Sequence, residues 1–389
     1  MFDNEKVSSF TYLSNPKTTI GNGQVRKLST LINDYGYKFP LILIDEGFAS
    51  GSDIWGECLN NLKNKFDSSL NIIQIPGKEP TYNDLRKHVE SSRKLKSDVV
   101  IALGGGSCMD IAKAVGALLT NPGDPIDYRG FDLLKKPGIP VICIPTTAGT
   151  GSEASFNASF VDEDTNFKMG INGKYMFASH AILDGETTLS CPKFPAVGAA
   201  IDAIVHTVEG YICNTSNEFS DFLAEKSFYY LINSISDLNN EKGDADKRLS
   251  LLKGAYLAGL VQMNAGGGIS SAISYPLGVY YKVPHGMAGG IMLLEMARYN
   301  IAKGYNKYQN LCKHYELKSI STSDDLISNM QIMFDELGVP KNLSQFNIYQ
   351  KDKSEVVRVM QTQQKGFDQN PIPFSCETDF PNFIDNFLE

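Results

Sequence analysis

The stretch LGGGSCMD (residues 103–110) decides the fold that we expect for this chain. It follows the apolar run VVIAL (99–103) and opens a segment with helical periodicity over residues 107–120. Glycines between a buried strand and a helix let the backbone approach a pyrophosphate, which free N–H groups and the positive end of the helix dipole then bind. A Gly-rich turn alone is a weak indicator, but this one has the required context of strand and helix. We therefore predict a phosphate-binding turn, with an ordinary tight turn as the alternative.

Similar strand-like runs lie on both sides of this turn. They are brief, rich in Ile, Leu and Val, and followed by Gly, Pro or Asp: FPLILID (39–45), LNIIQI (70–75), VVIAL (99–103) and PVICI (140–144). Between them, residues 50–66, 81–94 and 107–120 have helical periodicity. This alternation of buried strands and helices predicts a parallel sheet covered on both faces, as in a Rossmann-like domain.

The pattern changes after about residue 184, where strand-like runs stop. Amphipathic segments follow at residues 196–213, 219–238, 246–264, 285–303, 322–337 and 354–365. A chain of 389 residues is also long for one core. We therefore expect an α/β dinucleotide-binding domain over residues 1–188 and an all-α metal and substrate domain over residues 189–389.

Composition and charge exclude several classes of protein. The net charge of −8 and the absence of a long basic run argue against nucleic acid as a partner. No apolar run approaches the roughly 20 residues that span a bilayer, and the first residues lack the features of a signal peptide. The seven cysteines are scattered without a CxxC pair, so neither a disulfide framework nor a thiolate zinc site is indicated. We expect a cytoplasmic protein without a membrane partner.

Two further features suit a nucleotide. The loop PTTAGTGSEAS (145–155) offers hydroxyls and small residues for contact with a ribose, phosphate or nicotinamide amide, although it also reads as an ordinary polar turn. Asp45 ends the first predicted strand, where a carboxylate can bind an adenosine ribose and repel a 2′-phosphate. Asp45 can equally cap the following segment, and both readings stay open.

A candidate metal site lies in the second half. Asp202 and His206 are spaced i and i+4, so both lie on one face of a helix, and His285 begins another predicted helix. Two imidazoles and a carboxylate suit a divalent cation. The alternative for the first pair is a simple exposed Asp–His contact.

Taken together, these stretches resemble the iron-containing (group III) alcohol dehydrogenases over most of the chain. The matching motifs, in order, are GGGSCMDIAKA (104–114), NPG (121–123) with DYRG (127–130), IPTTAGTGSEAS (144–155), AILD (181–184), AAIDAIVHTVEGY (199–211) and PLGVYYKVPHG (276–286). The resemblance implies the dehydroquinate synthase-like fold, with a Rossmann-like domain, a helical domain and an active site in the cleft between them. It also implies a homo-oligomer, as a dimer.

The same resemblance implies NAD as cofactor and assigns residues to it. Glu79 stands where the family often has Asn. The residues implied in cofactor contact are Asp45, Glu79, Thr81, Gly105, Gly106, Ser107, Asp110, Thr146, Thr147, Thr150, Ser155, Asn157 and Lys168.

The metal ligands of the family match only in part. The family holds its metal with one Asp and three His, and Asp202, His206 and His285 match three of these four positions. The remaining ligand position is occupied by Ser271, and Tyr275 occupies the position of a further histidine of the family. A neutral hydroxyl is a weaker ligand than imidazole. Two possibilities stay open: three protein ligands and water hold Fe or Zn, or the site works without metal.

In a metal-free site, Tyr275 is the candidate catalytic residue for proton transfer. Its ordinary pKa of about 10 would have to be lowered for it to act as a base. The structural alternative is a buried aromatic ring beside the PLG turn (276–278).

The activity implied is hydride transfer between NAD(H) and a primary alcohol or aldehyde, a small-molecule substrate. The stretches NPGDPIDYRGFDLLKKP (121–137) and NEFSDFLAEKS (217–227), with Tyr275, most resemble the 3-deoxy-octulosonate 8-oxidase branch, which oxidises a sugar acid. Two alternatives stay open: a metal-depleted NAD-binding protein, and a dehydroquinate synthase-like lyase, whose basic phosphate pocket is not evident in the sequence.

Overall fold

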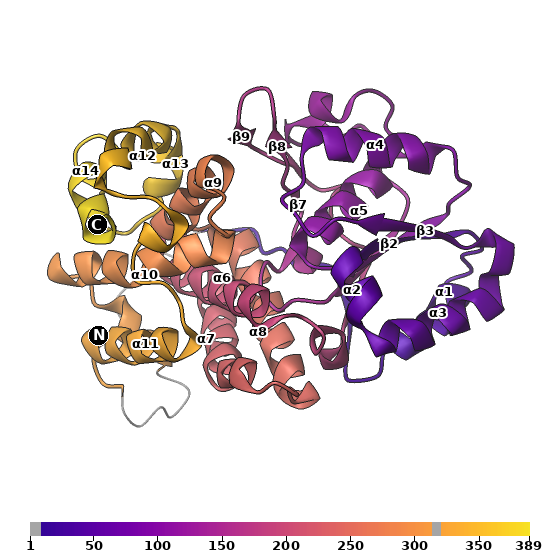
Figure 1. Cartoon of the computed structure of the whole chain (residues 1–389), viewed down its shortest axis with the longest axis horizontal. Coiled ribbons are helices and arrows are strands. Elements are labelled where there is room, and N and C mark those ends of the chain that lie inside the picture. The colour runs from indigo at the N-terminus through magenta and orange to yellow at the C-terminus, as the bar shows by residue number, and fades with distance from the viewer. Residues whose placement is uncertain (1–8, 313–319) are drawn as a thin grey trace.

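The computed structural model describes residues 9–312 and 320–389, which form an α/β half and a helical half side by side (Figure 1). The first half is built on a six-stranded parallel sheet in the order β1-β11-β6-β4-β2-β3. Its strands are β1 (Lys17–Ile20), β2 (Pro40–Asp45), β3 (Asn71–Ile75), β4 (Val99–Gly104), β6 (Val141–Pro145) and β11 (His180–Leu183). The expected parallel sheet is confirmed.

Alternate side chains of the central strands pack on opposite faces, as the twofold period of a strand requires. Ile42 and Ile44 of β2 face α1 (Leu28–Asp34) and α3 (Asp53–Phe66). Leu41 and Leu43 of the same strand face α4 (Tyr82–Arg93) and α5 (Gly106–Leu118), on the other side of the sheet (Figure 1). Helices on both faces explain why β2 and β4 read as continuous apolar runs.

The four predicted strands agree with the structure to within a residue or so, but two further strands of this sheet were not predicted. β1 is a polar edge strand of four residues, KTTI, and β11 is equally short. The expected helix over residues 50–66 is in fact α2 (Glu46–Gly51) and α3, because Ser52 between them has an extended backbone. Short or polar elements such as these lack the periodicity on which the prediction depends.

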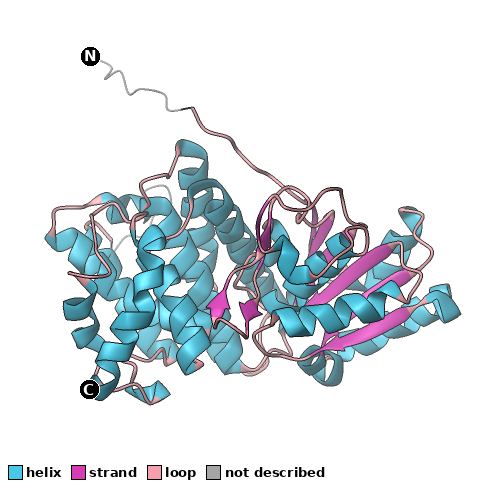
Figure 2. Ribbon diagram, turned by 90° about the horizontal axis from the view of Figure 1, so that it is seen from above, coloured by secondary structure: helices cyan, strands magenta, loops and turns pink. Residues whose placement is uncertain are grey.

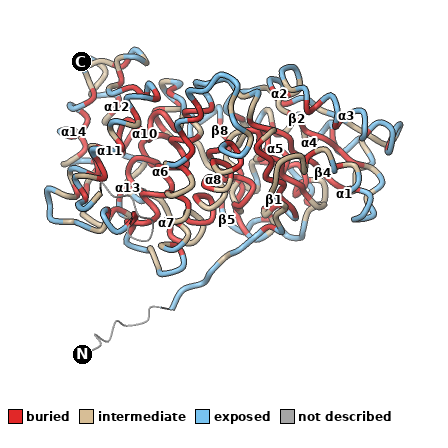
Figure 3. Tube along the Cα trace, turned by 90° about the horizontal axis from the view of Figure 1, so that it is seen from below, coloured by how far each residue is buried: buried red, intermediate tan, exposed pale blue. Residues whose placement is uncertain are grey.

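The second half is helical, as expected, and Figure 2 shows helices gathered at one end of the molecule and the sheet at the other. Buried segments run through the interior of both halves (Figure 3). The longer helices are α6 (Lys193–Ile212), α7 (Glu218–Ile232), α8 (Ala245–Ala265), α9 (Ile269–Tyr281), α10 (His285–Ala302) and α11 (Ser323–Leu337). Shorter ones follow at α12 (Lys353–Met360), α13 (Gln364–Phe367) and α14 (Phe380–Phe383). No helix in the described part of the chain is long and apolar enough to cross a bilayer.

Helix α9 was not predicted, because the glycines at 266–268 and Pro276 both resemble helix breakers. The Glu209 carboxylate of α6 stabilises the start of α9 by accepting hydrogen bonds from the backbone N–H groups of Ser270 (2.6 Å) and Ser271 (3.1 Å). Tyr275 therefore lies within a helix and not beside a turn, which corrects the structural alternative considered for it.

Short strands complete the α/β half and reach toward the helices. β5 (Gly130–Phe131), β7 (Asn157–Ala158) and β10 (Ile171–Asn172) form a small sheet, while β8 (Val161–Asp162) and β9 (Phe167–Lys168) form an antiparallel pair. β9 contacts α9 across the boundary between the two halves (Figure 1). This contact places Lys168 beside the helical half.

Candidate active site between the two halves

The Gly-rich turn forms a close junction with the polar loop that follows β6. A Cβ atom on Gly106 would lie 2.6 Å from Cγ2 of Thr150, and one on Gly105 would lie 3.2 Å from Oγ1 of Thr147. Helix α5 begins here without a side-chain cap and without an acidic residue in its first turn. Its first N–H groups and its dipole are therefore available to an anion, and the glycines let the polar loop pack closely against the start of the helix. Gly105, Gly106 and the start of α5 thus form a phosphate cradle that suits the phosphates of a dinucleotide.

Two residues of α5 hold the polar loop in place. The buried Lys113 ammonium donates hydrogen bonds to the backbone oxygens of Ser152 (2.8 Å) and Asn157. Asp110 accepts one from the Ser152 hydroxyl (2.6 Å) and one from the Ser159 N–H (2.8 Å). The sequence analysis gave Lys113, Ser152 and Ser159 no role of their own. The signal that could have marked Lys113 is a lysine among the mostly apolar residues of this helix.

Asp45, expected at the adenosine ribose, and Thr81, implied in cofactor contact, have structural partners as well. Asp45 Oδ1 accepts a hydrogen bond from the Phe48 N–H (3.0 Å), so this carboxylate does cap α2. Its Oδ2 atom has no hydrogen-bond partner among the described residues and stays available to a ribose. Thr81 caps α4 in a reciprocal box with Asp84. The cap and the ribose contact are therefore compatible roles for Asp45.

The remaining predicted contacts divide between the cradle and a cavity at the boundary. Ser107 lies in the first turn of α5, and Thr146 and Thr147 follow β6. Five predicted cofactor residues line the cavity together with the three predicted metal ligands and Tyr275. The full lining is Asp110, Thr150, Ser152, Ser155, Asn157, Ser159, Lys168, Asp202, His206, Gln262, Tyr275 and His285. The structure thus brings residues far apart in the sequence to one site.

Lys168 and Glu79 form an ion pair at the edge of this cavity, with 2.6 Å between Nζ and Oε1. Burial opposes the charge of Lys168, but the Glu79 carboxylate outweighs it and raises the pKa of the ammonium. Burial likewise opposes the charge of Glu79, and Lys168 lowers its pKa overall. The Lys168 ammonium also lies 5.1 Å from the centre of the Tyr275 ring. Both groups of the pair are therefore charged.

Asp202, His206 and His285 converge in the cavity. Oδ1 of Asp202 lies 3.6 Å from Nε2 of His206 and 3.7 Å from Nε2 of His285, and the three ligand atoms fall within 4.8 Å of one another. Helix α10 brings His285 to α6 through a close approach: a Cβ on Gly286 would lie 1.9 Å from the Gly198 backbone oxygen.

The chemistry of these three side chains suits a divalent cation. Burial lowers the pKa of His285 to about 4, so its imidazole is neutral, as a metal ligand must be. Nδ1 of His206 is buried without a hydrogen-bond partner among the described residues, so no hydrogen bond to that nitrogen fixes the ring. Two imidazoles and one carboxylate form a donor set that fits zinc or iron.

The residue at the missing ligand position is engaged elsewhere. Ser271 is buried, and its hydroxyl donates a hydrogen bond of 2.6 Å to Oε2 of Glu209. Four residues later, the Tyr275 ring packs edge-on against His285, with ring centres 5.0 Å apart. Burial raises the pKa of Tyr275, and Lys168 opposes this only in part. The phenol is therefore protonated at neutral pH.

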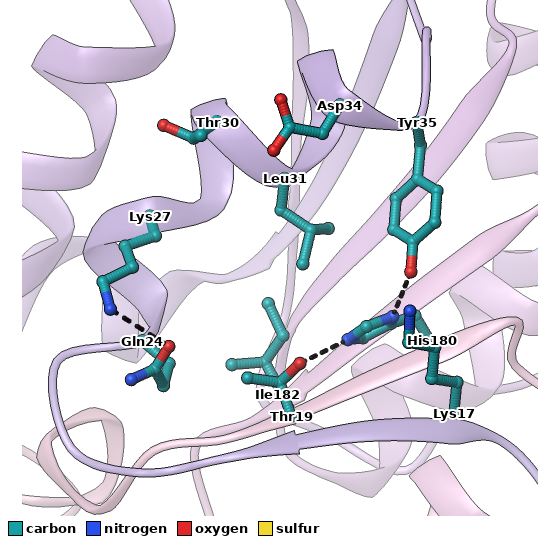
Figure 4. A pocket seen from close by; sticks show the side chains of 10 residues that line it. All are labelled: Lys17, Thr19, Gln24, Lys27, Thr30, Leu31, Asp34, Tyr35, His180 and Ile182. Carbon is teal, nitrogen blue, oxygen red and sulfur yellow. Dashed lines mark hydrogen bonds between the residues drawn. The ribbon is translucent and has the colours of Figure 1, made fainter.

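A roomier cavity lies elsewhere, between α1 and the edge strand β1 (Figure 4). Its volume is about 420 Å³, and His180 spans it with hydrogen bonds to Thr19 and Tyr35. None of the predicted cofactor or metal residues lines it. We assign the chemistry to the cavity between the two halves, although it is smaller. The convergence of titratable groups is a better indicator of an active site than the volume of a cavity.

These features describe an α/β and helical protein whose cleft pairs a nucleotide cradle with a metal-ligand cluster. The family model of iron-containing alcohol dehydrogenases matches residues 15–185, and the model of their C-terminal domain matches residues 196–378. The chain belongs to the iron-containing alcohol dehydrogenase family.

Individual relatives agree with this membership. The chain is 30% identical to a long-chain-alcohol dehydrogenase of Geobacillus thermodenitrificans over 92% of each chain. It is 25% identical to an NAD-dependent methanol dehydrogenase of Bacillus methanolicus over 87% of this chain and 89% of the relative. The crystal structure of a 1,3-propanediol oxidoreductase has the same fold, with a TM-score of 0.88 at 22% identity, over 98% of this chain and all of the other. The predicted class, an NAD-dependent oxidoreductase of alcohols and aldehydes, is supported.

Proposed function

We propose that the cleft transfers a hydride between NAD(H) and a small polar primary alcohol or aldehyde. The observation that carries this proposal is the shared cavity: five of the residues implied in cofactor contact line it together with Asp202, His206 and His285. The cradle of Gly105 and Gly106 would take the pyrophosphate, with Ser107, Thr146 and Thr147 beside it.

Each part of the site then has a role that follows from its position. Bound NAD would supply the hydride acceptor, and zinc or iron held by Asp202, His206 and His285 would supply a Lewis acid. Lys168 and Glu79 are both implied in cofactor contact, and their charged pair would offer ribose hydroxyls both a donor and an acceptor.

Tyr275 is our candidate for the group that contacts the reacting oxygen. Its raised pKa makes it a poor base, so we assign it the role of hydrogen-bond donor to an aldehyde or alkoxide oxygen. Its edge-on contact with His285 keeps the phenol beside the ligand cluster.

The engagement of Ser271 with Glu209 favours a second candidate function, a metal-poor NAD-binding protein without dehydrogenase activity. NADH absorbance, followed with a panel of alcohols and aldehydes before and after treatment with a chelator, separates the two. Turnover that is lost with the metal and restored by zinc or iron supports the dehydrogenase. NAD binding without turnover of any compound supports the alternative.

Finer assignments are also proposals. The likeness to the 3-deoxy-octulosonate 8-oxidase branch rests on residues 121–137 and 217–227 and on Tyr275, and it suggests a sugar acid as substrate.

We further propose a division into domains at residues 188 and 189, a cytoplasmic location and a homodimer. Among the described residues, the edge strand β1 pairs with β11 alone, and we propose that a second copy meets its other edge. Light scattering tests the dimer.

A further inference from the structure

Every residue that lines the active-site cavity carries at least one polar side-chain atom, so hydroxyl, amide and charged groups lie among its apolar surface. A plain alkyl chain placed there would displace water from amide, hydroxyl and charged groups without replacing their hydrogen bonds, which costs free energy. The lining therefore favours a substrate that carries more oxygen than the reacting group alone.

Gln262 lines this cavity, but neither the cofactor, the metal nor the catalytic proposals involve it. It lies in the last turn of α8, and its position is fixed by a close approach one turn earlier. A Cβ on Gly259 would lie 2.7 Å from the backbone oxygen of Gly151, so α8 packs directly against the polar loop. Gln262 thus reaches the cavity from the helical half, on the same wall as His206 and Tyr275.

Gln262 as a residue is half-buried, and its side-chain amide has no hydrogen-bond partner among residues 9–312 and 320–389. Its neighbour Asn264 provides a contrast. Asn264 accepts a hydrogen bond from the Leu13 N–H (2.6 Å) and donates to the backbone oxygens of Leu13 (2.9 Å) and Leu260 (2.8 Å). The Asn264 amide is used to hold the structure together, whereas the Gln262 amide keeps its donors and its acceptor for something in the cavity.

We infer that Gln262 binds a second hydroxyl of the substrate, on a carbon near the reacting one. A hydroxyl both donates and accepts, and a primary amide offers both functions in return. The substrate class is then hydroxylated alcohols and their aldehydes, such as vicinal diols and 2-hydroxyaldehydes, in preference to plain aliphatic ones. This inference rests on the proposed function and specifies its substrate.

The test compares matched substrates that differ by a single hydroxyl: propanal against 2-hydroxypropanal, and 1-propanol against 1,2-propanediol. A site built to hydrogen-bond a hydroxyl discriminates strongly against the compound that lacks it. We expect kcat/KM of the unmodified enzyme to favour the hydroxylated member of each pair by about tenfold or more. In Gln262→Leu, kcat/KM for the hydroxylated member should fall about 10-fold to 100-fold, while the value for the plain member should stay nearly constant.

Two further variants make the test specific. Met263→Leu changes the adjacent residue of α8, which does not line the cavity, and should leave both values unchanged. Gln262→Asn keeps the amide on a shorter stem and should retain part of the discrimination. If Gln262→Leu does not fold, the discrimination by the unmodified enzyme and its reduction in Gln262→Asn still decide.

Equal kcat/KM for both members of each pair would overturn the inference and leave the dehydrogenase proposal intact. An equal fall for both members in Gln262→Leu would also overturn it, because a purely structural role predicts that result. No turnover of any alcohol or aldehyde with NAD would overturn the proposed function, and this inference with it.

Discussion

Ser271 donates its hydroxyl hydrogen bond to Glu209, at 2.6 Å, and not to the cluster of metal ligands. The sequence comparison with the family placed Ser271 at a ligand position, where a hydroxyl would be a poor substitute for imidazole. The structure gives this residue another role, because Glu209 also accepts from the backbone N–H groups that begin α9. Ser271 therefore helps to join α6 to the helix that carries Tyr275.

The first prediction separates these two roles. Ser271→Ala removes a donor to a buried carboxylate, which should lower the free energy of unfolding by about 1–3 kcal/mol. The affinity for zinc, measured by calorimetry, should stay the same because no ligand is lost. Stability is read from denaturant unfolding. A tenfold weaker zinc affinity with unchanged stability would make Ser271 a ligand.

The second prediction concerns Tyr275. Tyr275→Phe keeps the ring that packs against His285 but removes the hydroxyl. If the phenol donates to the reacting oxygen, kcat for aldehyde reduction should fall about 100-fold or more, with zinc content and NADH affinity unchanged. Steady-state kinetics measures kcat directly. Unaltered kcat would reduce Tyr275 to a packing residue.

The third prediction tests the cradle. The Cβ of Gly105→Val would lie 3.2 Å from Oγ1 of Thr147, so the branched side chain should crowd the start of α5, where we place the pyrophosphate. Affinity for NAD should fall by about 100-fold or more, which corresponds to about 3 kcal/mol. Gly56→Ala in α3, where an added Cβ meets no atom within 4 Å, serves as control and should bind NAD normally. Calorimetry of Gly105→Val with undiminished NAD affinity would remove the cradle from this position.

The fourth prediction distinguishes the two roles of Asp45. Asp45→Ser keeps an oxygen that can cap α2 but removes the charge that repels a 2′-phosphate, so the preference for NAD over NADP should weaken with little loss of stability. Asp45→Ala should weaken the preference and also lower stability by about 1 kcal/mol. The ratio of kcat/KM for the two cofactors is the measurement. Equal use of NAD and NADP by the unmodified protein would count against the role.

The sequence predicted the parts of the fold that carry strong periodicity. Strands such as β2 and β4, buried on both faces, and long helices such as α6 appear as apolar patterns. The edge strand β1 is too short and polar to leave such a pattern, and α9 was hidden by Pro276 and the glycines before it. Local propensity was overruled there by tertiary contacts, among them the Glu209 carboxylate at the start of α9.

The candidate site was predictable where it follows a motif and not where it depends on packing. Asp202, His206 and His285 were found from spacing and resemblance, and the structure places them together. Gln262 had no motif to mark it, and Lys113 lies within GGGSCMDIAKA (104–114) without a role that the motif assigns to it. Their positions depend on contacts between segments far apart in the chain, such as the approach of Gly151 to Gly259. Sequence patterns alone do not report such contacts.

The most direct test of the central claim is the transfer of deuterium from NADH, deuterated at its transferable position, to an aldehyde. The unmodified protein with bound zinc or iron is incubated with 2-hydroxypropanal, and the alcohol formed is examined by mass spectrometry. We expect deuterium on the former carbonyl carbon, and its near absence in His206→Ala, which removes one ligand from the cluster. A deuterium-free product, no alcohol from any aldehyde tested, or an equal rate in His206→Ala would contradict the account.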